Sequence, residues 1–248
     1  MKKICFLLVL FFCPFSVFAI DLASNAKSAI IIEPTTGKII FDKNSNERLE
    51  PASMTKIMTL LLTFEAIDNG RVSLDDMVNI SKRAEDMGGS QMFLEAGSNI
   101  RLEEIIKGVS IASANDGAIA LAEFIGGSVE NFVDMMNKKV EDLGLSNTHF
   151  ANPHGLHADN HYSSAYDMAI MASNLISHEK VLNYTSIYED YFNKPDGSRT
   201  WLVNTNKLVR FLEGVDGLKT GYTSEAGYCL TATAKKGNVR YITVVMGE

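Results

Sequence analysis

Residues 51–67 of the chain read PASMTKIMTLLLTFEAI, and this stretch decides the fold that we expect. The segment from Ile57 to Ile67 is apolar nearly all round, which is typical of a buried helix rather than of a surface helix. Asn69-Gly70 follows the last apolar residue, and a glycine in that place commonly ends a helix. The sequence therefore predicts a central helix whose first turn opens into a cleft.

Ser53 and Lys56 lie three residues apart at the start of this predicted helix. Residues at that spacing share one face of a helix, so we expect the lysine amine within hydrogen-bond reach of the serine hydroxyl. A neutral lysine in that place can take the serine proton and create a nucleophile. About one Ser-x-x-Lys match is expected by chance in a chain of this length. Two more occur, at 24–27 and 177–180, but both are typical of solvated surface.

The composition is that of an ordinary globular protein, with 46% hydrophobic and 21% charged residues among 248. The N-terminus differs, because Lys2-Lys3 precede an apolar stretch that runs from Ile4 to Phe18. Val17-Phe18-Ala19 fits a cut after the alanine. We therefore predict a secretory signal peptide over residues 1–19 and export of the protein, with an uncleaved anchor as the alternative.

Removal of residues 1–19 changes the charge and the cysteine content. The full chain has 23 Lys+Arg and 30 Asp+Glu, and loss of two lysines takes its net charge from −7 to −9. This acidic balance argues against nucleic acid as a partner. Cys229 is the one cysteine left after the cut, so we expect no internal disulfide and a stability that comes from packing.

Apolar β-prone runs lie at both ends of the chain, and helical patterns lie between them. We predict a hairpin of 29–32 with 38–42, strands at 217–220, 227–234 and 239–246, and helices over 53–67, 102–124, 129–143 and 164–176. Strands from both termini predict one antiparallel sheet with an inserted helical lobe. This is an α+β fold with a cleft where the lobe meets the sheet.

Two further short motifs are candidates to face Ser53 across this cleft. Ser113-Ala114-Asn115 lies where the helical pattern must end or bend, and it offers a hydroxyl and an amide from a loop. Lys219-Thr220-Gly221 lies on a predicted strand, where the glycine lets a substrate backbone come close. Each motif alone is typical of an ordinary turn or strand end. Each occurs once, however, and the three motifs come in the order helix, loop, strand.

This ordered set resembles the penicillin-recognising serine enzymes, in which Ser-x-x-Lys, a Ser-x-Asn motif and Lys-Thr-Gly line one active site. The resemblance runs from about Ala26 to the end and is strongest to the low-molecular-mass penicillin-binding proteins that act as D-alanyl-D-alanine carboxypeptidases. Segments 88–94, 162–168 and 214–223 are similar to sporulation-associated members from endospore-forming bacteria.

The resemblance implies a DD-peptidase/β-lactamase-like fold for residues 20–248 and removal of the terminal D-alanine from peptidoglycan stem pentapeptides. It implies no cofactor. It also implies that the protein acts at the outer face of the cytoplasmic membrane, in the cell wall or in the periplasm.

The family's catalytic roles carry over to the matching residues. Ser53 would attack the carbonyl between the two terminal D-alanines and form an acyl-enzyme, with Lys56 as the base. Burial and the positive charge of Lys219 would lower the pKa of that base from its ordinary value of about 10.4. Ser113 would pass a proton to the leaving amine, and Asn115 would hold the substrate amide.

The resemblance also implies how the substrate is held. Lys219 and Thr220 would bind the terminal carboxylate. The backbone N–H groups of Ser53 and Tyr222 would form an oxyanion hole, a contribution of several kcal/mol in comparable sites. We expect His154, from the irregular segment 149–161, to touch the substrate.

Between Glu141 and Glu179 the sequence has no glutamate. Class A β-lactamases need one in a loop after the second motif to activate the deacylating water. We therefore expect β-lactams to acylate Ser53 and to remain bound as covalent inhibitors. Arg199 and Arg240 are further candidates for binding a carboxylate, although solvation at the surface explains both.

Three alternatives stay open at this point. A DD-endopeptidase or transpeptidase of the same family differs in cleft shape, which decides whether water or an amine resolves the acyl-enzyme. A non-catalytic binder of wall peptides is disfavoured because all the motif residues are present. His157-x3-His161 has a spacing that zinc can use, but neither His-Glu-x-x-His nor a nearby thiolate accompanies it, so we expect no metal.

Carboxypeptidases of this group continue beyond the last strand into a helix on the sheet, and usually into a β-rich domain and an amphipathic membrane anchor. The present sequence stops inside the last predicted strand. We therefore expect a catalytic domain truncated at its C-terminus, without that helix and with apolar surface bare on the sheet. Contact with a membrane surface would need a segment absent here.

Overall fold

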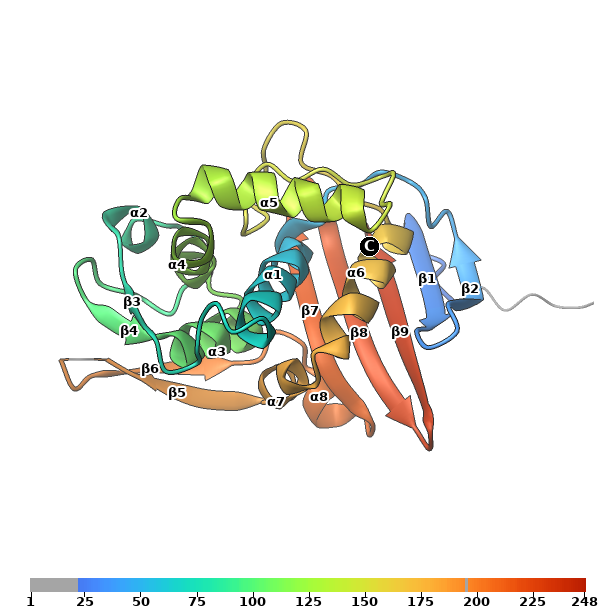
Figure 1. Cartoon of the computed structure of the whole chain (residues 1–248). Coiled ribbons are helices and arrows are strands. Elements are labelled where there is room, and N and C mark those ends of the chain that lie inside the picture. The colour runs from blue at the N-terminus through green and yellow to red at the C-terminus, as the bar shows by residue number, and fades with distance from the viewer. Residues whose placement is uncertain (1–21, 195) are drawn as a thin grey trace, which may run out of the picture.

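The fold is described for residues 22–194 and 196–248 of a computed structural model, so the predicted signal peptide at 1–19 lies outside the described residues. Its centre is a five-stranded antiparallel sheet (Figure 1). From edge to edge the strands are β2 (Lys38–Lys43), β1 (Ser28–Glu33), β9 (Val239–Met246), β8 (Gly227–Lys236) and β7 (Val215–Thr223). Both ends of the chain build one sheet, which confirms the predicted α+β arrangement.

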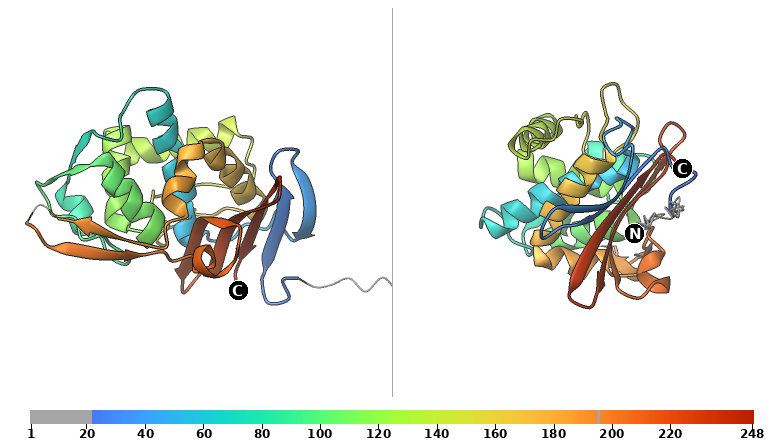
Figure 2. Two further views of the ribbon diagram at one scale, coloured as in Figure 1. Left: turned by 90° about the horizontal axis from the view of Figure 1, so that it is seen from below. Right: turned by 90° about the vertical axis from the view of Figure 1, so that its right-hand side faces the viewer.

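One face of this sheet carries the main core. Alternate residues of β1 and β9, such as Ile30 and Val244, are fully buried, as period-two patterning requires. They face α6 (Ala165–Ser177), which packs against both strands, and the large helices lie together on this side of the sheet (Figure 2). α1 (Lys56–Asp68) is buried between the sheet and the helical lobe.

The lobe lies beside the β7 edge of the sheet (Figure 1). Its helices are α2 (Lys82–Glu85), α3 (Leu102–Ala112), α4 (Asn115–Gly126) and α5 (Val129–Asp142). The pattern predicted over 102–124 is therefore two helices, and the break falls at Ser113-Ala114, where the sequence required an end or a bend.

Several short elements were not predicted. They are α2, β3 (Met77–Asn79), β4 (Asn99–Arg101), β5 (Glu189–Asn193), β6 (Arg199–Val203), α7 (Leu182–Thr185), α8 (Leu208–Phe211) and a 3₁₀ turn at Glu179–Val181. β5 and β6 form a hairpin that reaches away from the sheet beneath the lobe (Figure 1). Within the described ranges, no helix combines the length and the apolar character needed to span a membrane.

The start of the central helix differs from the prediction. Ala52–Thr55 form a 3₁₀ turn, and the α-helix begins only at Lys56. Side chains three residues apart eclipse one another in a 3₁₀ turn, so this geometry stacks the serine over the lysine more directly than an α-helix does. The other end is as predicted, because Asn69 caps α1 and Gly70 follows with a φ of 68°.

Candidate active site

The centre of the site is the amine of Lys56, whose side chain is fully buried. Its Nζ lies 2.9 Å from Ser53 Oγ, 2.7 Å from Asn115 Oδ1 and 2.7 Å from the carbonyl oxygen of His154. The amide and carbonyl oxygens can only accept hydrogen bonds. A neutral amine gives its two hydrogens to these two oxygens, and its lone pair then faces the Ser53 hydroxyl. The geometry therefore fits an amine that accepts the serine proton.

Electrostatics favour that neutral form. Burial lowers the pKa of Lys56 well below its ordinary value of 10.5, and the positive charge of Lys219 lowers it further, while Asp116 opposes both effects. Lys219 is also buried, with 1% of its surface exposed, and burial lowers its pKa to about 7. Its Nζ donates to the Thr220 carbonyl at 2.9 Å.

The break between α3 and α4 presents the second motif. Ser113 ends α3 in a left-handed conformation with a φ of 62°, and it is almost completely buried at the edge of the cavity that Ser53 also lines. Asn115 begins α4, with its backbone N–H bonded to the Ser90 carbonyl and its side-chain Nδ2 bonded to the Gly88 carbonyl, each at 2.7 Å. The side-chain amide therefore holds Lys56 and the 88–94 loop, and its contact with a substrate amide stays a prediction.

Sequence reasoning assigned no role to Asp116, although this buried carboxylate shapes the site. Its oxygens accept backbone N–H groups from Met92 at 3.1 and 3.2 Å and from Leu94 at 3.0 Å. The loop that receives Asn115 is thus fixed by the next residue of the chain. The available signal was an acidic residue in the first turn of an apolar helix, where it also complements the helix dipole.

β7 brings the third motif against the Ser53 turn. A Cβ on Gly221 would lie 3.0 Å from both the Ser53 nitrogen and the Pro51 carbonyl oxygen. The glycine therefore allows close approach of the turn itself, and close approach of a substrate backbone stays a prediction. The strand and the turn enclose a cavity of about 600 Å³. Its lining includes five of the predicted residues: Ser53, Ser113, Thr220, Gly221 and Tyr222.

The loop after α5 closes the site from the other side. Gly155, with a φ of 90°, packs so tightly that a Cβ would lie 1.9 Å from the Ala52 carbonyl oxygen, and the Thr59 hydroxyl donates to the Pro153 carbonyl at 2.6 Å. This packing places the His154 carbonyl oxygen within hydrogen-bond distance of Lys56 Nζ. The residue predicted to touch substrate thus enters the site through its backbone, and burial lowers the pKa of the His154 imidazole to about 3.

The two histidines with zinc spacing have different surroundings. His161 is buried, and its Nδ1 accepts the Ala151 N–H at 3.0 Å, so its Nε2 carries the hydrogen that bonds Thr55 Oγ1 at 2.8 Å. Burial lowers its pKa to about 4. His157 is exposed, and its Nδ1 lies 2.7 Å from a Glu50 oxygen, a contact that raises the pKa of the imidazole.

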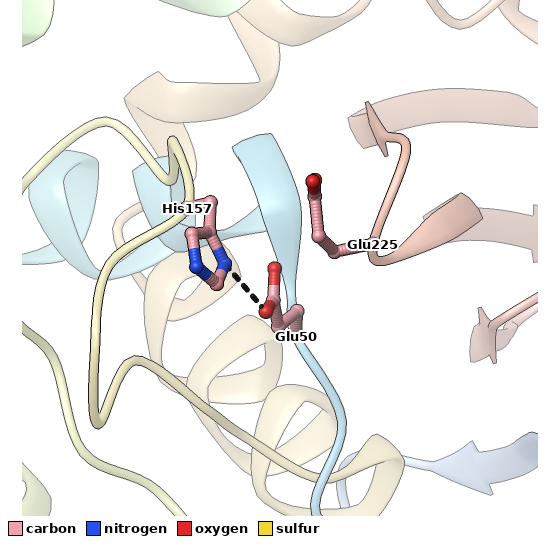
Figure 3. Close-up of side chains that lie close together, drawn as sticks. All are labelled: Glu50, His157 and Glu225. Carbon is pink, nitrogen blue, oxygen red and sulfur yellow. Dashed lines mark hydrogen bonds and ion pairs between the residues drawn. The ribbon is translucent and has the colours of Figure 1, made fainter.

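A cluster with metal-ligand spacing does occur within the described ranges, but His161 is not part of it. Glu50, His157 and Glu225 offer ligand atoms that all lie within 4.8 Å of one another (Figure 3). The histidine and Glu225 are exposed, and such exposed acidic groups are common without an ion. Proximity is the one property that suggests a metal, so we assign none to the cluster.

The two arginines considered for carboxylate binding lie elsewhere. Arg240 makes a two-pronged ion pair with Asp216, with nitrogen-to-oxygen distances of 2.7 and 2.8 Å. Arg199 lies on the β5–β6 hairpin, with its Cζ 4.9 Å from the ring centroid of Tyr191. Neither arginine lines the cavity that holds Ser53.

Comparison with known proteins agrees with this geometry. A family profile described as D-alanyl-D-alanine carboxypeptidase, Peptidase S11, matches residues 17–248. The chain is 58% identical over 227 residues to D-alanyl-D-alanine carboxypeptidase DacF of Bacillus subtilis, covering 92% of this chain and 58% of that protein. It is 40% identical over 230 residues to DacA of Escherichia coli K12, covering 90% of this chain and 56% of the relative.

Solved structures show the same likeness. The D-alanyl-D-alanine carboxypeptidase DacD of Francisella tularensis superposes with a TM-score of 0.87 at 31% identity, over 90% of this chain and 66% of that one. Penicillin-binding protein 5 of Haemophilus influenzae superposes with a TM-score of 0.84 at 39% identity, over 90% of this chain and 65% of that one. The chain spans less than three fifths of the length of the two sequence relatives. The family predicted from the three motifs is confirmed: the chain belongs to the D-alanyl-D-alanine carboxypeptidases of the S11 peptidase family.

Proposed function

We propose that this chain is the catalytic part of a serine-type D-Ala-D-Ala carboxypeptidase that removes the terminal D-alanine from peptidoglycan stem pentapeptides. The observation that carries the proposal is the 2.9 Å contact between Ser53 Oγ and the buried Lys56 Nζ. Burial lowers the pKa of this amine well below its ordinary value and so favours its neutral, basic form, and its two fixed acceptors direct its lone pair to the hydroxyl.

Acylation starts when Ser53 Oγ bonds to the carbonyl carbon between the two D-alanines and its proton passes to Lys56 Nζ. The carbonyl π electrons move to its oxygen, which then carries a negative charge. The backbone N–H groups of Ser53 and Tyr222 are the proposed donors to this oxyanion. Gly221 supports this assignment, since its missing side chain lets β7 lie directly against the serine turn.

Collapse of the tetrahedral intermediate breaks the bond to the leaving nitrogen, which needs a proton to depart as the amine of D-alanine. Ser113 is proposed to relay that proton from the Lys56 ammonium. Ser113 lines the same cavity as Ser53, and Lys56 Nζ contacts the Ser53 hydroxyl. Lys219 and Thr220 are proposed to hold the terminal carboxylate. Water then attacks the ester and gives its proton back through Lys56, which regenerates the Ser53 hydroxyl.

The same chemistry supports covalent binding of β-lactams. Their ring opening leaves an acyl group on Ser53 without releasing a fragment from the site. Among the residues described between Glu141 and Glu179, no glutamate is available to activate a hydrolytic water. Slow release of the penicilloyl group is therefore part of the proposal. The wall substrate also implies action beyond the cytoplasmic membrane, after export.

A transpeptidase outcome is the second candidate. The chain superposes on the DD-transpeptidase of Streptomyces K15 with a TM-score of 0.83 at 27% identity, over 90% of each chain. In such a reaction an amine in place of water attacks the acyl-enzyme. Adding an amine acceptor such as glycine or D-alanine to the assay measures the partition directly. Hydrolysis to tetrapeptide as the main product supports the carboxypeptidase, and exchange as the main product supports the transpeptidase.

The decisive experiment measures free D-alanine released from a pentapeptide by the wild-type protein and by Ser53→Ala. We expect loss of release by at least about a thousandfold, since the nucleophile is removed. Ser177→Ala is the matched control, because Ser177 also precedes a lysine by three residues but lies exposed on α6. Equal release by wild type and Ser53→Ala would end the proposal. Labelled penicillin should mark the wild type and the control but not Ser53→Ala.

A further inference from the structure

The segment from Asn204 to Leu208 is fixed at the edge of the cavity by buried hydrogen bonds. The Thr205 N–H donates to the Ile111 carbonyl at 3.1 Å, two residues before Ser113. The Asn206 side chain, itself buried, donates to the Gly217 carbonyl at 3.0 Å, two residues before Lys219. The segment therefore connects the backbone just before the second motif with the backbone just before the third.

Lys207 is the exposed residue of this segment, and it lines the same cavity as Ser53 and Thr220. Its Nζ donates to the Asn204 carbonyl at 3.0 Å and lies 5.4 Å from the ring centroid of Tyr188. An ammonium has three donors, so two remain after this bond. No carboxylate within the described ranges makes an ion pair with it.

Arg210 adds a second cation beside Tyr188, three residues beyond Lys207, although it is not itself among the residues that line the cavity. It belongs to α8, and its Cζ lies 4.6 Å from the ring centroid of Tyr188, the ring that Lys207 also contacts. It too has no ion pair with any described residue. Two like charges held beside one aromatic ring, with no anion between them, create a positive potential at the cavity edge.

We propose that Lys207 and Arg210, positioned by Tyr188, form a cationic rim that binds a carboxylate of the peptide substrate as it enters the active-site cavity. This inference rests on the proposed function and deepens it by naming a second anion-binding point. It replaces Arg199 and Arg240, which the sequence suggested for carboxylate binding and which the structure places away from the cavity.

The negative charge of the rest of the molecule explains why a cationic rim would favour substrate binding. The chain has a net charge of −7, which repels an anionic peptide at long range. Lys219 cannot fully offset this repulsion, since burial lowers its pKa to about 7 and leaves it only partly charged at neutral pH. The exposed Lys207 and the guanidinium of Arg210 supply positive charge that does not depend on the state of Lys219.

The test compares steady-state kinetics of D-alanine release for wild type, Lys207→Ala, Arg210→Ala and the double variant. Loss of uniform binding raises KM and leaves kcat unchanged. We expect KM to rise roughly three- to tenfold in the double variant, and the effect to shrink as salt screens exposed charges. Lys207→Arg should restore most of the affinity. Arg199→Ala is the matched control, because its guanidinium also lies over a tyrosine but on the distant hairpin.

The substrates identify which carboxylate is bound. One is an N-acylated tripeptide whose single carboxylate is C-terminal, and the others are pentapeptides with one further upstream carboxylate, either free or amidated. A KM increase with all three assigns the rim to the C-terminal carboxylate. An increase confined to the free pentapeptide assigns it to the upstream group. An unchanged KM with all substrates, or an equal increase in Arg199→Ala, overturns the inference.

Failure of the rim and failure of the proposed function can be told apart. If the wild type releases no D-alanine, the carboxypeptidase proposal fails. The rate of acylation by a penicillin, which carries a carboxylate, still tests the rim, because it reports on Ser53 without any peptide cleavage. We expect that rate to fall about threefold or more in the double variant and to be unchanged in Arg199→Ala. An unchanged rate in the double variant would then exclude the rim as a binding point for the C-terminal carboxylate, whether or not the carboxypeptidase proposal holds.

Discussion

Asn115 Oδ1 lies 2.7 Å from Lys56 Nζ, and the orientation of that amide is fixed. Its Nδ2 faces the Gly88 carbonyl at 2.7 Å, and a carbonyl requires a donor, so the oxygen must face the lysine. Asn115 therefore positions Lys56, the proposed base. It also couples that lysine to the 88–94 loop.

Replacing Asn115 by Asp should shift the acidic limb of the pH profile upward. A carboxylate beside Lys56 Nζ favours the ammonium and raises the pKa of the lysine, so less of it is a free base at neutral pH. We expect acylation by penicillin to fall at least about tenfold at pH 7 and to recover partly as the pH rises. Asn115→Ala is the control, since it removes the contact without adding charge. A profile of the same shape in Asp and Ala variants would contradict this prediction.

The pH dependence of kcat/KM should report the titration of two lysines, of which Lys56 must lose its proton for activity and Lys219 must keep its proton. Activity rises as the pH passes upward through the lowered pKa of Lys56, because only the neutral amine is a base. It falls above about pH 7, where Lys219 loses the charge that would bind the terminal carboxylate. Lys219→Arg keeps that charge, so its alkaline fall should disappear. Persistence of the fall in a folded Arg variant would show that another group controls it.

Gly155→Ala should damage both stability and activity. A Cβ there meets the Ala52 carbonyl oxygen at 1.9 Å, which forces the turn that carries Ser53 to move. Gly197→Ala is a matched control with a similar φ, +86° against +90°, but nothing within 4 Å of the added carbon. Both variants bear the left-handed strain of roughly 1 kcal/mol. We expect a further loss of about 2 kcal/mol or more in Gly155→Ala alone, measured by urea unfolding.

Asp116→Asn should loosen the 88–94 loop. The carboxylate accepts N–H groups from Met92 and Leu94, and an amide can satisfy them with one oxygen only. We expect a loss of about 2–3 kcal/mol in the free energy of unfolding, since bonds to a buried charge are the strong ones. Asp142→Asn, which alters an exposed pair with Lys138, should cost less than 1 kcal/mol. Equal losses in the two variants would show that Asp116 is not an anchor.

The sequence predicted the main elements because their signals are strong and local. The apolar run after Lys56 has the length of a helix and ends at a glycine, whereas the β-prone runs at both termini are short and bounded by turn residues. The break at Ser113 was also foreseen, since a serine and an asparagine interrupt an apolar helix there. These are the features that fix the sheet, the lobe and the site between them.

The parts that were missed depend on contacts that no local pattern encodes. The β5–β6 hairpin buries essentially one residue per strand, Phe192 and Leu202, so its alternation is weak. The contact of Asn115 with the 88–94 loop depends on a carbonyl 27 residues away, and the packing of Gly221 against the Ser53 turn joins segments that are distant in sequence. Lys207 carried no motif, and its interest arises only from the cavity that it lines.

The place of β9 in the sheet determines when the sheet can form during synthesis and folding. It lies between β1 and β8, and it pairs Ser28 with Met246 and Leu230 with Val245. Ser53 and Lys56 are therefore synthesised long before the strand that joins the two halves of the sheet exists. Closure of so long a loop gives the domain a high contact order and makes assembly of the catalytic centre a late folding event. A chain that stalls before its last strand would contain all three motifs but could not assemble them into one site.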